Sequence, residues 1–389
     1  MAHRTSGIFG RELRREDYQG RPQTYVKHLF LKRYLYALAF KVLQAPGSNL
    51  DFLYIDGFSG PWKSTADHRS DTSFSIALTV LSDVARHLRD RGLMPHIRAI
   101  FVEKNRGASE ELECAVAEFP LIESVVINGQ FEECIPRIVK MVGGAFVFTF
   151  VDPTGWTGLA LKKLAPLLCI SRSEVLINMM AYSLTRHLEL PSVQGGLEEY
   201  FGGPGWRERY CQIYGGTRQR EEAFRQTYLV RLKEICNFRY VGTTRVRFGG
   251  QQRTYFYLVY GTRHPAGMEV FRDTERKAVE VQEDLAYGSV IGKASEGGRM
   301  ADMLVGVENP NLGVFRAWES VSRAEARAEF DAWLASGSLR REPDASAHFM
   351  QYPHVDMKLV KAWFIEAEAA GRLSRRPGSR GGAVLVPTP

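Results

Sequence analysis

The chain lacks the features that mark several common classes of protein. Its five cysteines stand singly, without a C-x-x-C pair or a histidine spacing suited to zinc, which argues against a zinc centre and predicts buried free thiols. The first residues form no secretory apolar segment, and no later stretch approaches the roughly 18 apolar residues of a membrane-spanning helix. No internal repeat or low-complexity block is present. We therefore expect a folded cytoplasmic protein without a membrane segment.

The common phosphate-binding motifs are missing from the first strand-turn segment, DFLYIDGFSGPW at residues 51–62. It has neither the G-x-G-x-x-G of dinucleotide-binding folds nor the G-K-[ST] ending of a P-loop. Its apolar run ends in Asp56, which predicts a buried strand that opens onto a ligand. Gly57 and Gly60 allow backbone angles and close approaches that a side chain would block, so a cofactor could reach the backbone beside Phe58. An ordinary strand followed by a tight turn is the alternative.

The size and composition predict a globular protein of two domains. The 389 residues exceed one average domain, and 44% hydrophobic with 11% aromatic residues can supply a sizeable core. The net charge of +7 favours contact with a polyanion such as nucleic acid, although many basic proteins bind none. Charge alone does not decide between these alternatives.

The second and third predicted strands also end in polar side chains. HIRAIFVEKN places Glu103 directly after an apolar run, where nucleoside-binding α/β folds keep a carboxylate for the ribose hydroxyls. SVVINGQFEE places Asn128 after the next run, where its amide could meet the edge of an adenine ring and Phe131 could pack on the ring face. The alternatives are a solvated charge at Glu103 and an ordinary Asn-Gly turn at Asn128.

The fourth strand ends in the sequence VDPTGW at residues 151–156. Methyltransferases that act on exocyclic amines of bases place a D/N-P-P-aromatic motif at this point, and Asp152, Pro153 and Trp156 match it in part. Thr154 replaces the second proline, and the aromatic residue comes later than in the motif. The alternative is a turn that starts the helix near Gly158.

Taken in order, these segments resemble the three-Cys-motif partner family, TcmP. The resemblance rests on DGFSGPW, FVEKN, NGQFEE, VDPTGW and GTRHPAGMEVFRD, covers most of residues 23–280, and departs from the family pattern at Ser59, Trp62 and Thr154. It implies a Rossmann-type, methyltransferase-like fold with S-adenosylmethionine as cofactor. It also implies a partner protein whose three-cysteine motif resembles radical S-adenosylmethionine proteins. The predicted cofactor-binding residues are Asp56, Gly57, Phe58, Gly60, Glu103, Asn128 and Phe131.

The pattern of strands and helices predicts an α/β fold with a doubly wound, Rossmann-like methyltransferase-type sheet. This domain is expected at residues 23–290, after an N-terminal extension at 1–22, with a possible insertion at 193–240 and an antiparallel pair as its last two strands. An apolar helix with Lys27, Lys32, Arg33 and Lys41 precedes the first strand. We expect it to pack on the sheet, and a basic lid over the cofactor is the alternative.

Residues 300–389 change in character and predict a small winged-helix-like domain. Two helical segments are followed by SRRPGSRGGAVLVP, a basic hairpin with an apolar second strand. Arg372, Arg375, Arg376 and Arg380 would contact nucleic acid phosphates in this interpretation. A protein-contacting winged helix and a solvated basic tail are the alternatives.

Two functions remain open at this stage. In the first, Asp152 and Trp156 orient an amine of DNA or RNA against the methyl group of S-adenosylmethionine. In the second, the domain is a non-catalytic scaffold that binds the three-Cys-motif partner and nucleic acid. The target base, the choice between DNA and RNA, and the oligomeric state are not indicated by the sequence.

Overall fold

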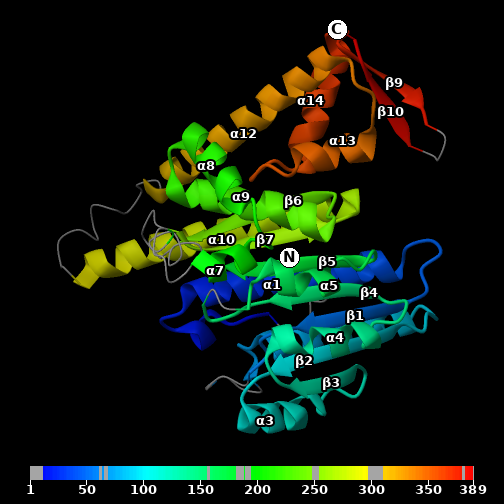
Figure 1. The fold of residues 1–389 in the computed structure, drawn as a ribbon, viewed down its shortest axis with the longest axis vertical. Coiled ribbons are helices and arrows are strands. Elements are labelled where there is room, and N and C mark those ends of the chain that lie inside the picture. Colours follow the sequence, from blue (N-terminus) through cyan, green and yellow to red (C-terminus); the bar gives the residue numbers. More distant parts are fainter. Residues whose placement is uncertain are drawn as a thin grey trace, which may run out of the picture.

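A mixed seven-stranded sheet forms the centre of the fold (Figure 1). The computed structural model describes residues 12–60, 64, 69–155, 158–180, 188, 194–247, 254–296, 310–378 and 382–388. The strands are β1 (Asp51–Asp56), β2 (His96–Glu103), β3 (Glu123–Asn128), β4 (Phe146–Val151), β5 (Ser173–Met179), β6 (Tyr240–Arg247) and β7 (Thr254–Thr262). Their order is β3-β2-β1-β4-β5-β7-β6; β1 to β5 are parallel, and β7 is antiparallel to β5 and β6. The predicted mostly parallel sheet with an antiparallel pair is confirmed and is consistent with a Rossmann-like methyltransferase fold.

Helices cover both faces of the sheet because the strands bury apolar side chains on both sides. In β1, Phe52 and Tyr54 belong to one apolar cluster, and Leu53 and Ile55 belong to the other. The first cluster packs against α1 (Pro22–Leu43), α2 (Ser73–Arg89), α3 (Arg106–Val116) and α10 (Pro265–Glu296). The second packs against α4 (Phe131–Met141), α5 (Leu161–Leu168), α7 (Gln194–Tyr200), α8 (Trp206–Thr217) and α9 (Arg220–Cys236). This layering agrees with the predicted doubly wound architecture, and α7 to α9 lie in the predicted insertion.

Helix α1 packs on the sheet as the sequence predicted. It begins at Pro22, where the absence of a backbone N–H removes no helical hydrogen bond. Phe30 and Tyr34 are fully buried between the sheet and α10. Its basic residues do not form one solvent-facing side, since Lys32 is buried and Lys27 reaches the end of β4. A short 3-10 helix, η1 (Arg15–Tyr18), packs against α1 through Tyr18 and Tyr25.

The C-terminal unit combines helices with a small antiparallel sheet. Its elements are α12 (Pro310–Ser336), β8 (Arg340–Arg341), α13 (Glu342–Phe349), α14 (Met357–Ala369), β9 (Leu373–Pro377) and β10 (Ala383–Pro387). The strands lie in the order β8-β10-β9. Phe330, Trp363 and Leu385 join the same apolar cluster as α1 and α10. In Figure 1 this unit lies beyond β6, the edge strand of the sheet. The predicted domain end at residue 290 falls within α10.

The cysteines are free, but the prediction that they are buried is wrong for most of them. Cys114, Cys169 and Cys211 are exposed, Cys134 is partly buried, and Cys236 is buried. Cys114 and Cys211 lie on outward sides of α3 and α8, which helical spacing alone does not distinguish from inward sides. Within the described ranges, no helix is long and apolar enough to cross a membrane, and no group of three or more His, Cys, Asp or Glu side chains could hold a metal ion.

Candidate functional site

Four predicted site residues lie at the carboxyl ends of neighbouring parallel strands. Asp56 ends β1, Glu103 ends β2, Asn128 ends β3, and Asp152 follows β4. Glu103 lies opposite Asn128 in the β2–β3 register, while Asp56 lies opposite Phe150, two residues before Asp152. The structure therefore brings all four to one edge of the sheet, where ligands of open α/β folds bind.

Asp56 is a buried carboxylate held in place by the turn that follows it. Its Oδ1 accepts a hydrogen bond from the backbone N–H of Phe58 at 3.1 Å, and its Oδ2 accepts one from the Tyr54 hydroxyl at 3.4 Å. The Asp56 side chain is fully buried. Burial raises the pKa of this carboxyl to about 6, partly opposed by the hydrogen bonds from Ser73 and Phe58. A carboxyl perturbed in this way at a strand end is typical of a functional site.

The turn after Asp56 needs glycine because other side chains approach its backbone closely. Unusual backbone angles are not the reason. A Cβ at Gly57 would lie 2.8 Å from Cδ1 of Phe131, and a Cβ at Gly60 would lie 2.5 Å from Oε2 of Glu103. Neither glycine has a positive φ. The backbone N–H of Gly57 donates to Phe150 O at 3.0 Å, which ties the turn to β4. The Gly60 backbone thus lies directly against the carboxylate that ends β2.

Glu103 and Asn128 form the next part of the edge. Oε1 of Glu103 accepts a hydrogen bond from the backbone N–H of Asn105 at 2.6 Å. The Asn128 side chain donates to the carbonyl oxygens of Glu103 at 2.9 Å and Lys104 at 3.3 Å. Both contacts are made by the amide nitrogen and hold β3 against the loop after β2. The Oδ1 of this exposed side chain is therefore the atom that could accept a hydrogen bond from an exocyclic amine of a ligand.

The two predicted aromatic cofactor contacts pack mainly against the protein. Phe131 is only 3% exposed and lies beneath Gly57. Its ring meets Phe58 edge to face, with centroids 5.7 Å apart. Phe58 is half-buried and lies against Gly158, which has no room for a side chain. Phe131 therefore supports the turn, and its ring offers no open face on which a base could stack.

Asp152 has two side-chain partners that sequence reasoning did not connect with it. Lys27 of α1 donates to Oδ2 at 2.5 Å, and Asn178 of β5 donates to Oδ1 at 2.6 Å. Lys27 and Asp152 are each less than 15% exposed. The Oδ1 atom of Asn178 is buried and has no hydrogen-bond partner among the residues that the structure describes. Pro153 is buried beside this group, and Trp156 lies outside the described residues.

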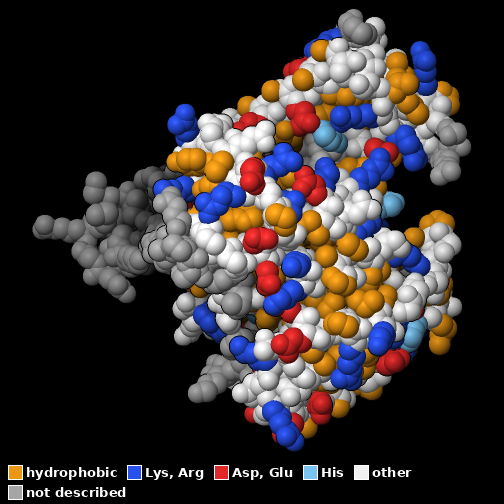
Figure 2. Space-filling view, viewed as in Figure 1, with side chains coloured by type: hydrophobic (Ala, Val, Ile, Leu, Met, Phe, Trp, Pro, Cys, Tyr) orange, Lys and Arg blue, Asp and Glu red, His pale blue; other side chains and the backbone are white. Residues whose placement is uncertain are grey.

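The four arginines predicted to contact nucleic acid differ in whether an ion pair within the protein already engages them. Arg372 is paired with Asp331 at 3.1 Å, and Arg375 is paired with Glu368 at 2.7 Å. Arg376 is exposed and has no ion pair with any described residue. Arg380 lies outside the described part of the chain. On the face in Figure 2, Lys and Arg side chains alternate with Asp and Glu and form no single large basic patch.

The strand order and the row of polar strand ends place the protein in the Rossmann-like α/β class. No family model matches the chain, and no curated protein matches it. Among solved structures, it is similar to one described as loganic acid methyltransferase with SAH, at 8% identity over 67% of this chain and 82% of that one, with a TM-score of 0.28. This similarity is too low to indicate the fold or the activity of the chain. The fold class therefore rests on strand order and register.

Proposed function

We propose that the carboxyl edge of the sheet binds S-adenosylmethionine and that the protein is methyltransferase-like, acting on or with nucleic acid. The contact between the Gly60 backbone and the Glu103 carboxylate carries the proposal. A side chain at Gly60 would displace the Glu103 carboxylate, which in this proposal meets the ribose of the cofactor at the adjacent strand end. Asp56 would face the amino acid part, Glu103 the ribose and Asn128 the base.

S-adenosylmethionine would supply an electrophilic methyl group, and the chain's own residues would align a nucleophilic amine for in-line transfer. Both oxygens of Asp152 accept hydrogen bonds, from Lys27 and Asn178. An amine that approached Asp152 would therefore have to displace the Lys27 ammonium. The buried Asn178 Oδ1, which has no partner among the described residues, would become an acceptor for the amine once Lys27 is displaced. In this proposal Asn178 orients the amine beside Asp152, Pro153 and Trp156.

A second candidate function is a non-catalytic scaffold that works with a three-Cys-motif partner. The Lys27–Asp152 ion pair favours it, because this pair occupies the position that a substrate amine would need. The partner itself is proposed from the sequence resemblance to the TcmP family. Transfer of a labelled methyl group to DNA or RNA, with and without that partner, would separate the two functions.

S-adenosylhomocysteine, the product form of the cofactor, should bind to the wild type and bind at least about tenfold more weakly to Glu103→Ala. Gly60→Ala should weaken binding similarly, because its Cβ would push the Glu103 carboxylate aside. The stability of Gly60→Ala should change little, since the displaced atoms are the end of a half-exposed, flexible side chain. Isothermal titration calorimetry and thermal melting test both expectations.

Gly215→Ala is the matched control for Gly60→Ala. Gly215 lies in α8, and a Cβ there would meet nothing within 4 Å. This variant should bind S-adenosylhomocysteine as the wild type does and should be slightly more stable, because alanine favours the helix. If the wild type produces no binding heat at ligand concentrations of about 1 mM, the site does not bind this cofactor.

We further propose that the C-terminal unit is winged-helix-like and contributes to nucleic-acid binding. Three helices followed by a basic β9–β10 hairpin, with the short β8 on the other side of β10, support this interpretation. The unit shares an apolar cluster with α1 and α10. Deleting the unit would open that cluster, so single substitutions test its role more cleanly.

Arg376→Ala should remove about one phosphate contact with duplex DNA. The slope of the logarithm of the binding constant against the logarithm of the salt concentration should then become about 0.9 less steep. The reason is that Arg376 is exposed and has no carboxylate partner among the described residues. Arg375→Ala is the matched control in the same strand, and its ion pair with Glu368 predicts a smaller change. Fluorescence anisotropy over a salt series measures both slopes. Equal slopes for Arg376→Ala and the wild type would assign the hairpin to protein contact.

A further inference from the structure

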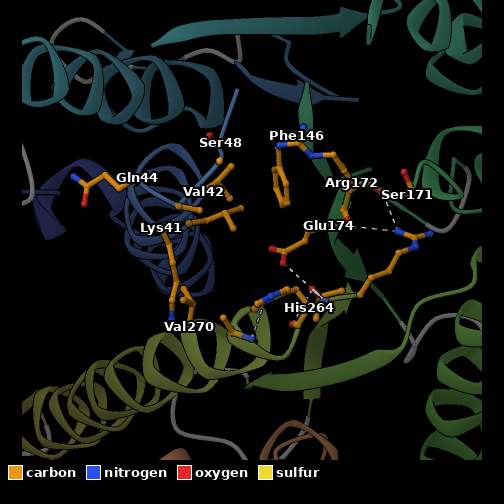
Figure 3. Close-up of a pocket in the computed structure, with 18 of the residues that line it drawn as sticks. Lys41, Val42, Gln44, Ser48, Phe146, Ser171, Arg172, Glu174, His264 and Val270 are labelled. Carbon is orange, nitrogen blue, oxygen red and sulfur yellow. Dashed lines mark hydrogen bonds between the residues drawn. The ribbon is translucent and has the colours of Figure 1, made fainter. Parts of the chain in front are cut away.

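A separate cavity lies at the opposite edge of the sheet from the cofactor-binding residues. It has a volume of about 700 Å³ and is lined by the end of α1, residues 44–48, the starts of β4 and β5, and the start of α10 (Figure 3). Small-molecule sites commonly enclose roughly 300–1,000 Å³. The cavity is therefore large enough for a ligand, and none of the predicted site residues lines it.

One part of the lining is apolar. Leu38 and Val42 come from α1, Phe146 from the start of β4, and Val270 from α10. These side chains come from three different elements, and Val42 and Phe146 lie near one another above the centre of the view in Figure 3. Burial of an apolar ligand body against them is favourable by the area that it removes from water.

Two guanidinium groups in the lining have no carboxylate partner in the part of the chain that the structure describes. Arg172 donates to the carbonyl oxygen of Gly144 at 3.2 Å and to Oδ1 of Asn49 at 3.3 Å. Arg263 donates to the carbonyl oxygen of Leu168 at 2.8 Å. All these partners are neutral, and within the described residues neither arginine forms an ion pair.

Among the described residues, Glu174 is the only carboxylate that lines the cavity, and both of its oxygens accept hydrogen bonds. The Tyr34 hydroxyl donates to Oε2 at 2.5 Å, and the Thr262 hydroxyl donates to Oε1 at 2.7 Å. His264 accepts a hydrogen bond from the backbone N–H of Ala266 on Nδ1, so its neutral ring carries the proton on Nε2 and can donate. The charged side chains of the lining that are left to meet an ionic ligand are therefore cationic, and His264 adds a neutral donor.

We propose that this cavity binds a small amphiphilic acid. Its apolar body would pack against Leu38, Val42 and Val270, and its anionic group would bind the guanidinium of Arg172 at the exposed rim. Arginine is well suited to carboxylate and sulfonate oxygens because it presents several N–H donors in one plane. The site involves neither the proposed cofactor nor nucleic acid, so its test is independent of the proposed function.

Anilinonaphthalene sulfonate, an aromatic sulfonate whose fluorescence rises in apolar surroundings, is a suitable probe. The full-length protein should bind it at one saturable site, and decanoate should displace it. Arg172→Glu should weaken binding about tenfold, because attraction becomes repulsion. Ala266→Trp should abolish binding by filling the cavity from a half-buried position at the start of α10. Arg106→Glu makes the same charge change on distant α3 and should bind as the wild type does.

Three results would overturn the proposal. One is equal affinity of Arg172→Glu and the wild type for the probe. Another is displacement of the probe by decyltrimethylammonium as effectively as by decanoate, which would show that the charge of the ligand does not matter. The third is displacement by phosphatidylglycerol vesicles but not by decanoate, which would assign the surface to a lipid bilayer. Thermal melting of each variant separates loss of binding from loss of folding.

Discussion

Replacing Arg272 with methionine should lower the free energy of unfolding by about 3–5 kcal/mol. Arg272 of α10 is 1% exposed, and its guanidinium donates to Glu275 Oε2 at 2.7 Å and to the carbonyl oxygens of Thr243, Met350 and Gln351. The substitution leaves the equally buried Glu275 carboxylate without its cation. Chemical denaturation of the wild type and the variant measures the loss.

Arg276→Met is the matched control on the same helix. Arg276 pairs with Glu280 at 3.2 Å, but both side chains are more than half exposed, so its loss should cost less than about 1 kcal/mol. A double variant, Arg272→Met with Glu275→Leu, should recover much of the lost stability because no unpaired charge stays buried. If Arg272→Met costs no more than Arg276→Met, the buried ion pair does not hold the structure together.

Arg272 also connects the two parts of the molecule. Met350 and Gln351 belong to the C-terminal unit, whereas Thr243 belongs to β6 of the central sheet. One side chain on α10 therefore fixes the end of α13 relative to the sheet edge strand. The C-terminal unit also shares an apolar cluster with α1 and α10, although its sequence reads as a separate domain.

The parallel strands could be predicted because each is a short apolar run that ends abruptly in a polar residue. Asp56, Glu103 and Asn128 are the ends of β1, β2 and β3, and strand parallelism alone brings such ends to one edge. Helix α1 could also be predicted as a packed helix from its recurring large apolar residues. These features depend only on local sequence and on the geometry of a sheet.

The partners of the site residues could not be predicted, because they come from distant segments. Lys27 lies 125 residues before Asp152, and no local pattern indicates that this lysine of α1 reaches the end of β4. Asn178 is the penultimate residue of β5, and the adjacency of β4 and β5 is the signal that could have paired it with Asp152. Glu174 reads as an exception in a buried strand, and its partners Tyr34 and Thr262 become visible only in the fold.

Asp56→Asn should stabilise the fold above about pH 6 by up to roughly 3 kcal/mol. Burial raises the pKa of Asp56 from 3.8 to about 6, so the folded state binds this proton more tightly than the unfolded state does. The stability linked to the proton is present below pH 3.8 and is lost as the pH rises through about 6. Asparagine carries no such charge. The difference in unfolding free energy between variant and wild type should therefore grow as the pH rises from 3.8 to about 6 and should level off above that range.

The same substitution should abolish or strongly weaken binding of S-adenosylhomocysteine, because the proposed cofactor contact needs the carboxylate. Asp51→Asn is the matched control at the other end of β1, where the carboxylate pairs with Arg98 at 3.3 Å. It should leave binding unchanged and should not increase stability at high pH. Binding by Asp56→Asn equal to that of the wild type would make Asp56 a structural carboxyl. A buried charge that served only packing would be better replaced by a neutral side chain. If Asp56 lowers stability and is nevertheless essential for binding, its carboxylate serves the function of the site and not the stability of the fold.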